Sequence, residues 1–281
     1  MSEAIPLTRP SARPQVIAGV ALGGAALATL LVGREAVSAF LAALVVAAYV
    51  DLRRLLGPWG HIVTTILGAG GVVAFLWSGY GGRLDLVPAA GAALVLALLA
   101  SRVLLHEASG NVEGTTADVA STLGAAAVVG VFGAHILLIR SLPRNGFRAL
   151  LAFAAMVLAA DVAAFVVGRW RGRHRMAPNL SAAKTWEGAL AGLVASVIAG
   201  GVCGVVLDPP FDPRSGLALG AATGVLAILG DLVFSVVKRG ETARGAAVPN
   251  YLGPLGGALD VLDGLLFAAP AFYWALRTLA L

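Results

Sequence analysis

The chain has 281 residues, of which 59% are hydrophobic and only 12% are charged, and its mean hydropathy is +0.89. Soluble domains carry roughly a quarter charged residues, so this composition excludes a soluble protein and indicates an integral membrane protein. The formal net charge of +5 sets topology in such a protein, and we expect no nucleic-acid partner. The single cysteine, Cys203, excludes an intrachain disulfide and a cysteine-based metal site.

Apolar runs follow one another along the chain, and each is about long enough to cross a hydrocarbon core of roughly 30 Å as a helix. The sequence therefore predicts an all-α, polytopic membrane helix bundle with about nine transmembrane helices. We expect residues 1–14 to form a cytoplasmic tail and 15–281 a single membrane domain, with its catalytic half at about 147–281. The runs lie near 15–33, 35–50, 61–78, 84–105, 117–139, 147–168, 188–207, 216–237 and 259–280.

Basic residues gather between alternate runs. If Arg9 and Arg13 keep the N-terminus inside, the segments 51–60, 106–118, 169–187 and 238–258 share the cytoplasmic side. Three of these segments satisfy the positive-inside rule, and 106–118 is an acidic exception. We therefore expect a multi-pass protein of the cell membrane whose active site faces the cytoplasm.

Two aspartates, Asp161 and Asp231, lie inside apolar runs, where a central Asp costs roughly 2.5–3.5 kcal/mol on insertion scales. Each therefore needs polar surroundings, either in a functional site or in a structural hydrogen bond near a helix end. On a helix, Asp231, Ser235 and Lys238 are spaced i, i+4 and i+7, so they share one face. That face is a reasonable lining for a polar cavity.

A second helix start carries Asp260 and Asp263, spaced i and i+3. Two carboxylates on one face can share a hard cation such as Mg²⁺; the alternative is an acidic first turn favoured by the helix dipole. The two lysines of the chain, Lys184 and Lys238, fall beside these acids. Acids for a divalent metal and ammonium groups for phosphates are the parts of metal-assisted phosphoryl or nucleotidyl transfer.

Three stretches resemble the C-terminal signature of phosphatidate cytidylyltransferases, the CDP-diacylglycerol synthases. They are Ser181-Ala-Ala-Lys-Thr-Trp-Glu-Gly188, Gly230-Asp-Leu with Ser235 and Lys238-Arg239, and Leu252-Gly-Pro-Leu-Gly-Gly-Ala-Leu-Asp-Val-Leu-Asp263. The resemblance implies a polytopic enzyme that transfers CMP from CTP to phosphatidic acid in phospholipid biosynthesis. Its products would be CDP-diacylglycerol and pyrophosphate, and its cofactor Mg²⁺.

Carried over position by position, the resemblance assigns roles to the polar residues of these stretches. It implies CTP, phosphatidic acid and the lipid bilayer as partners, and a homodimer is compatible with it. The implied metal ligands are Asp231, Asp260 and Asp263, and the implied catalytic residues are these three with Lys184 and Lys238. The implied substrate-binding residues are Ser181, Thr185, Trp186, Glu187, Ser235, Arg239 and the upstream Asp161.

The chain also departs from the family signature, which usually has Glu, His and Arg where Phe234, Leu255 and Val261 stand. Restoring these three polar groups is therefore expected to speed turnover. An alternative is a homologue that keeps the fold but has lost the reaction or changed its lipid substrate. A third interpretation is an ion-coupled transporter that uses Asp161 and Asp231 as cation sites within the membrane.

Overall fold

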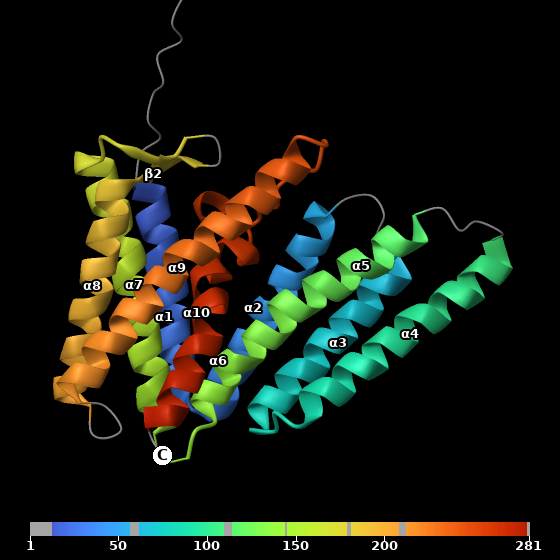
Figure 1. Ribbon diagram of the computed structural model, residues 1–281, viewed down its shortest axis with the longest axis horizontal. Helices are drawn as coiled ribbons and strands as arrows, with labels where there is room; N and C mark the ends of the chain where they lie inside the picture. Colours follow the sequence, from blue (N-terminus) through green and yellow to red (C-terminus); the bar gives the residue numbers. More distant parts are fainter. Residues whose placement is uncertain are drawn as a thin grey trace, which may run out of the picture.

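The computed structural model describes residues 13–56, 62–109, 114–143, 145–178, 181–207 and 212–279. Within these ranges the chain is almost entirely helical, with one two-stranded hairpin (Figure 1). The elements are α1 (Arg13–Val32), α2 (Arg34–Leu55), α3 (Ile62–Tyr80), α4 (Leu86–Ser109), α5 (Thr115–Ala125), the π-helical turn η1 (Ala126–Val131), α6 (Phe132–Arg140), α7 (Gly146–Arg171), β1 (Arg175–Ala177), β2 (Ser181–Thr185), α8 (Trp186–Val206), α9 (Pro213–Thr242), the short 3-10 turn η2 (Gly253–Leu255) and α10 (Ala258–Leu279).

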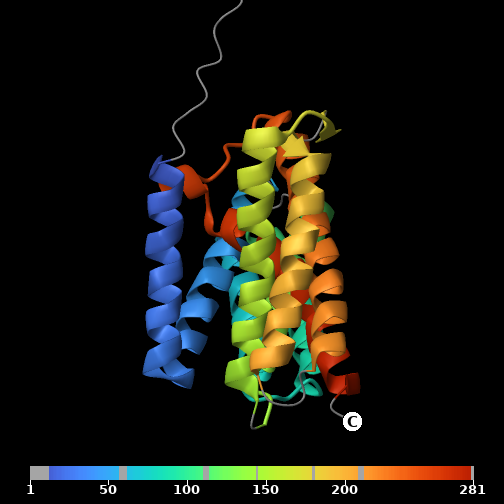
Figure 2. The same cartoon turned by 90° about the vertical axis from the view of Figure 1, so that its left-hand side faces the viewer.

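The predicted all-α membrane bundle is confirmed. Eight helices in the described ranges are long and apolar enough to cross a membrane, with α5, η1 and α6 forming one continuous span. The first predicted run coincides with α1, whose clearly apolar portion, Ile17–Thr29, is shorter than a full span. Figure 2 shows α1 at the edge of the bundle beside α2. The predicted tail, 1–14, lies outside the described residues except for its last two positions, which begin α1.

The helices alternate in direction, so the predicted polar segments meet at one end of the bundle. Figure 1 shows the starts of α1, α3, α5, α8 and α10 at the same end as the last turns of α2, α4, α7 and α9. The hairpin of β1 and β2, paired antiparallel with Arg175 opposite Thr185, lies at this end as well. We call it the polar end.

Small residues allow α8 to pack closely between α7 and α9. A Cβ atom at Gly192 would lie 2.8 Å from the carbonyl oxygen of Ala160 in α7. On the other side of α8, the buried Ser196 Oγ donates a hydrogen bond of 2.8 Å to the carbonyl oxygen of Gly220 in α9. Close backbone approach and interhelical hydrogen bonds hold helices together in lipid, where the hydrophobic effect does not.

Helix α10 lies at the centre of the packing and contacts α9, α6 and α2. Phe272 of α10 packs against Phe153 of α7 with ring centroids 5.0 Å apart, and both side chains are buried. Because α10 begins at the polar end between α2 and α9, its first turns meet residues from both halves of the chain.

A buried ion network joins the four N-terminal spans of the bundle. Asp118 of α5 accepts hydrogen bonds from Arg53 Nη2 of α2 at 2.7 Å and from Thr64 Oγ1 of α3 at 2.8 Å. It also pairs with Arg102 of α4. Removing one partner of a buried pair leaves an uncompensated charge, so the four helices depend on one another at this network.

Candidate active site

Lys184 reaches from the hairpin to α9. Its ammonium nitrogen lies 2.7 Å from Asp231 Oδ1 and donates to Ser235 Oγ at 3.4 Å. Ser235 Oγ in turn donates to the carbonyl oxygen of Asp231 at 2.7 Å. The predicted polar face of α9 is therefore the face that meets Lys184.

Local structure explains how Lys184 is placed there. The next residue, Thr185, has an extended backbone and its side chain accepts a hydrogen bond from Gly188 N at 3.1 Å. This is an N-cap, which ends the strand and starts α8 within one residue. Lys184 is thus fixed at the point where the hairpin turns down into the bundle.

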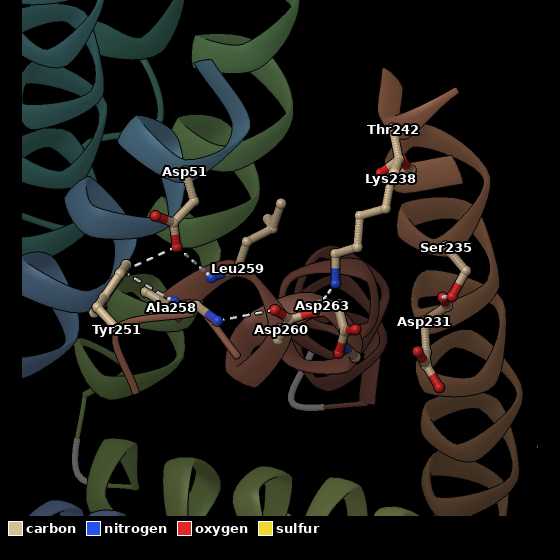
Figure 3. A network of polar contacts seen from close by, with 12 residues as sticks. Asp51, Asp231, Ser235, Lys238, Thr242, Tyr251, Ala258, Leu259, Asp260 and Asp263 are labelled. Carbon is tan, nitrogen blue, oxygen red and sulfur yellow. Dashed lines mark hydrogen bonds and ion pairs between the residues drawn. The ribbon is translucent and has the colours of Figure 1, made fainter. Parts of the chain in front are cut away.

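The second lysine, Lys238, joins α9 to α10. Its ammonium pairs with the Asp260 carboxylate and also interacts electrostatically with Asp263 and Asp231. Figure 3 shows its side chain extending from α9 toward these two acids at the start of α10. The other oxygen of Asp260 accepts a hydrogen bond of 2.9 Å from Gly257 N, so Asp260 also caps its own helix.

Three carboxylates from three helices interact electrostatically with one another. Asp263 of α10 interacts electrostatically with Asp231 of α9 and with Asp161 of α7, which remains exposed. Gly230 permits this approach, because a Cβ atom there would lie 2.7 Å from the carbonyl oxygen of Asp263. The tertiary structure therefore joins the two acids from apolar runs with one from the start of α10.

These oxygen ligands suit a magnesium ion. Within the described ranges, no three His, Cys, Asp or Glu side chains are already gathered as a metal cluster. Mg²⁺, however, usually binds through one or two carboxylates together with water and substrate phosphates. Asp231 and Asp263, which interact across α9 and α10, fit that requirement, although Asp231 Oδ1 also pairs with Lys184. In Asp260 both carboxylate oxygens are already engaged, one by Lys238 and the other by Gly257 N.

The other predicted residues surround this cluster without entering it. Glu187 Oε1 lies 2.6 Å from His174 Nδ1, and both carboxylate oxygens share the backbone N–H of His174 at 3.2 Å, so Glu187 closes the hairpin. Ser181 lies opposite Ala177 in the hairpin register. Trp186 and Arg239 are exposed at the polar end.

Sequence reasoning missed Asp51 of α2, which is buried against the start of α10. Its Oδ2 atom accepts hydrogen bonds from Tyr251 Oη at 2.9 Å and from Leu259 N at 3.3 Å. Burial is the largest cause that raises the pKa of Tyr251, and the hydrogen bond to Asp51 adds to it. The only signal in the sequence is an acid directly after an apolar run, ahead of Arg53 and Arg54.

Phe234 belongs to the core and not to the polar site. It is 2% exposed and packs edge-on against Phe267 of α10, with ring centroids 6.1 Å apart at 86°. The expectation that a glutamate there would join the site does not agree with this packing. Leu255 and Val261 are partly buried near the start of α10.

A family model covers nearly the whole of the bundle. The model of the cytidylyltransferase family matches residues 13–279, which is nearly the entire chain. The chain belongs to this family. The matched residues include all eight spans and the stretches that carry the two lysines and the aspartates of the site.

Curated relatives extend the comparison to named enzymes. The phosphatidate cytidylyltransferase of Mycobacterium leprae is 28% identical over 284 residues, covering 95% of this chain and 88% of that protein. The enzyme of the same name from Mycobacterium bovis is 29% identical over 290 residues, again covering 95% and 88%. The match to the phosphatidate cytidylyltransferase of Synechocystis sp. is 37% identical over 127 residues, and spans only 41% of that protein.

Proposed function

We propose that this protein is a phosphatidate cytidylyltransferase that transfers CMP from CTP to phosphatidic acid. The chain is a membrane enzyme of the cytidylyltransferase family, and its relatives of nearly full length carry that name. The observation that carries the proposal is the cluster in which Lys184 meets Asp231 and Lys238 meets Asp260, with Asp263 beside them. Two ammonium groups and several carboxylates lie together in this cluster, and they would serve a triphosphate as phosphate contacts and as ligands of its metal ion.

The proposed reaction is a displacement at phosphorus. A phosphate oxygen of phosphatidic acid attacks the α-phosphorus of CTP and forms a new phosphorus–oxygen bond. The bond from the α-phosphorus to the oxygen bridging the β-phosphate breaks, and pyrophosphate leaves with the electron pair. Such transfers depend mainly on positioning and on electrostatic stabilisation of the phosphoryl oxygens.

Lys184 and Lys238 would contact these phosphate oxygens in place of their present carboxylate partners. Asp231 and Asp263 are the residues that would hold Mg²⁺, which would neutralise charge on the triphosphate and on the departing pyrophosphate. Ser235, which already accepts a hydrogen bond from Lys184, keeps that ammonium on the reacting side of α9. Asp161 of α7 interacts electrostatically with Asp231 and with Lys184, and it would add a third carboxylate to the site.

The depth of the cluster suits a lipid substrate. Asp161 and Asp231 each lie about ten residues before the end of their helix at the polar end, which is roughly 15 Å along the axis. A lipid phosphate at the membrane surface and a nucleotide from water can both approach a site at that level. The basic residues of the polar end support a cytoplasmic orientation in the cell membrane, as phospholipid biosynthesis from CTP requires.

The decisive experiment is incorporation of label from α-labelled CTP into lipid by the purified protein in mixed micelles. We expect label in a chloroform-soluble product only when phosphatidic acid is present. A parallel reaction with γ-labelled CTP should leave its label in pyrophosphate. If the protein binds CTP but neither incorporates the α-label into lipid nor releases labelled pyrophosphate, the proposed activity is refuted. That result would favour a homologue that has lost the reaction.

A further inference from the structure

Helix α10 begins without a capping side chain directly before it, since the preceding residue is Gly257. The first amides of a helix have no partner within the helix and need one elsewhere. Here Ala258 N donates to Tyr251 Oη at 3.0 Å, and Leu259 N donates to Asp51 Oδ2 at 3.3 Å. The start of the helix that carries Asp260 is therefore capped by a residue of α2, some two hundred positions earlier in the chain.

Burying the Asp51 carboxylate at this position costs free energy. Its side chain is 1% exposed, and its Oδ1 atom has no hydrogen-bond partner among the described residues. A Cβ atom on Gly257 would lie 2.5 Å from Asp51 Oδ2, so only a glycine allows the carboxylate to come this close. The positive end of the α10 dipole compensates part of the cost of burying a charge. An acid kept under these conditions requires an explanation beyond packing.

The first turns of α10 lie between Asp51 on one side and Lys238 on the other, as Figure 3 shows. Lys238 pairs with Asp260, and its ammonium interacts electrostatically with Asp263 and with Asp51. A shift or fraying of this turn would move Asp260 and Asp263 relative to Lys238. The place of both acids therefore depends on Asp51.

We propose that Asp51 is a positioning residue of the active site. Through Tyr251 and Leu259 it fixes the first turn of α10, and so sets how Asp260 and Asp263 face the lysine of α9. The kinetic consequence rests on the proposed cytidylyltransferase activity, whereas the structural consequence does not. The N-terminal half of the chain thereby takes part in building a site whose chemistry lies in residues 147–281.

The test compares Asp51→Ala and Asp51→Asn with Asp212→Ala as a matched control. Asp212 also caps a helix through its side chain, which accepts from Arg214 N at 2.8 Å and from Ser215 N at 3.2 Å, but it does so at the start of α9, at the opposite end of the bundle. Tyr251→Phe is a second variant that removes the donor to Asp51 from an exposed residue. One readout is hydrogen exchange of peptides covering 252–262, and the other is CTP-dependent turnover at saturating substrates.

We expect Asp51→Ala to speed exchange in the first turn of α10 at least tenfold, while Asp51→Asn, whose amide oxygen can still accept from Leu259 N, stays near wild type. The kcat of Asp51→Ala should fall by roughly 10–100-fold, as is typical when a supporting partner is lost. Its KM for CTP should change less than threefold. Tyr251→Phe should show the same pattern in weaker form.

Each other outcome is informative. Unchanged exchange in both Asp51→Ala and Tyr251→Phe would overturn the proposal, as would an equal effect of Asp212→Ala on exchange in 252–262 and on kcat. Faster exchange with wild-type kcat would remove Asp51 from the support of the reacting groups. If the native protein shows no CTP-dependent turnover but exchange responds as expected, the proposed function fails while the positioning of α10 by Asp51 stands.

Discussion

Phe234→Glu is the change for which the family signature and the structure make opposite predictions. The signature has glutamate at this position, so the substitution should add a polar group to the site and raise turnover. In the structure Phe234 is 2% exposed, and its ring packs edge-on against Phe267. The structure therefore predicts a loss of stability instead.

The size of that loss follows from the contacts that disappear. Truncating a buried phenylalanine costs about 3–5 kcal/mol, and the edge-to-face pair adds roughly 0.5–1.5 kcal/mol. Burying the new carboxyl without a partner adds to this cost. With a total of about 5 kcal/mol and about 2–4 °C per kcal/mol for a chain of this size, Tm should fall by roughly 10–20 °C.

Thermal unfolding of the purified protein in mixed micelles measures this, with Phe234→Leu as the matched control. The leucine removes the aromatic contact but keeps the site apolar, so its loss should be no more than about a third of that of the glutamate. Turnover of Phe234→Glu, measured well below its Tm, should not exceed wild type. A Phe234→Glu protein with unchanged Tm and faster turnover would refute the assignment of Phe234 to the core.

Three further results are expected. Lys184→Met should lower kcat by about 100-fold or more, because an ammonium aimed at developing charge is lost. Arg173→Met, an equal charge change at an exposed position between α7 and the hairpin, should stay within twofold in the same assay. We expect Mg²⁺ to raise the Tm of the wild type, and Asp263→Asn should abolish that rise, whereas the exposed Asp85→Asn at the other end should keep it; an unchanged response would remove Asp263 from the metal ligands. Because the folded pKa of Tyr251 is raised, its contribution to stability is complete below about pH 10 and is lost as the pH rises further. Tyr251→Phe lacks this contribution at every pH, so its Tm, followed by circular dichroism, should fall less than that of the wild type when the pH is raised above about 10.

Much of the site was readable from local spacing. Hydropathy alone predicts the helices, since a run of about 20 apolar residues has one stable form in lipid. The i, i+4, i+7 spacing predicts the shared face of Asp231, Ser235 and Lys238, because a helix places those positions on one side whatever surrounds it. The i, i+3 spacing of Asp260 and Asp263 likewise predicts that these two side chains share one face of their helix.

Glycine spacings show where local reasoning stops. The pairs Gly188/Gly192 and Gly200/Gly204 have the small-residue spacing that permits close helix contact, and in the structure both lie against neighbouring helices. Gly19 and Gly23 have the same spacing, yet no atom lies within 4 Å of a Cβ built at either position. The spacing permits an interface, but a second helix must arrive to make one.

The packing partner of Phe234 and the capping role of Asp51 are set by the tertiary structure alone. Phe234 lies between two site residues in sequence, yet its ring meets Phe267 of α10, because the partner of a helix face depends on which helix packs there. Asp51 reads as an ordinary acid at a membrane boundary, and it becomes a cap only when α2 and α10 are brought together from opposite ends of the chain. Periodicity determines which residues share a face of one helix, whereas the neighbour of that face is set by long-range packing, which no local pattern encodes.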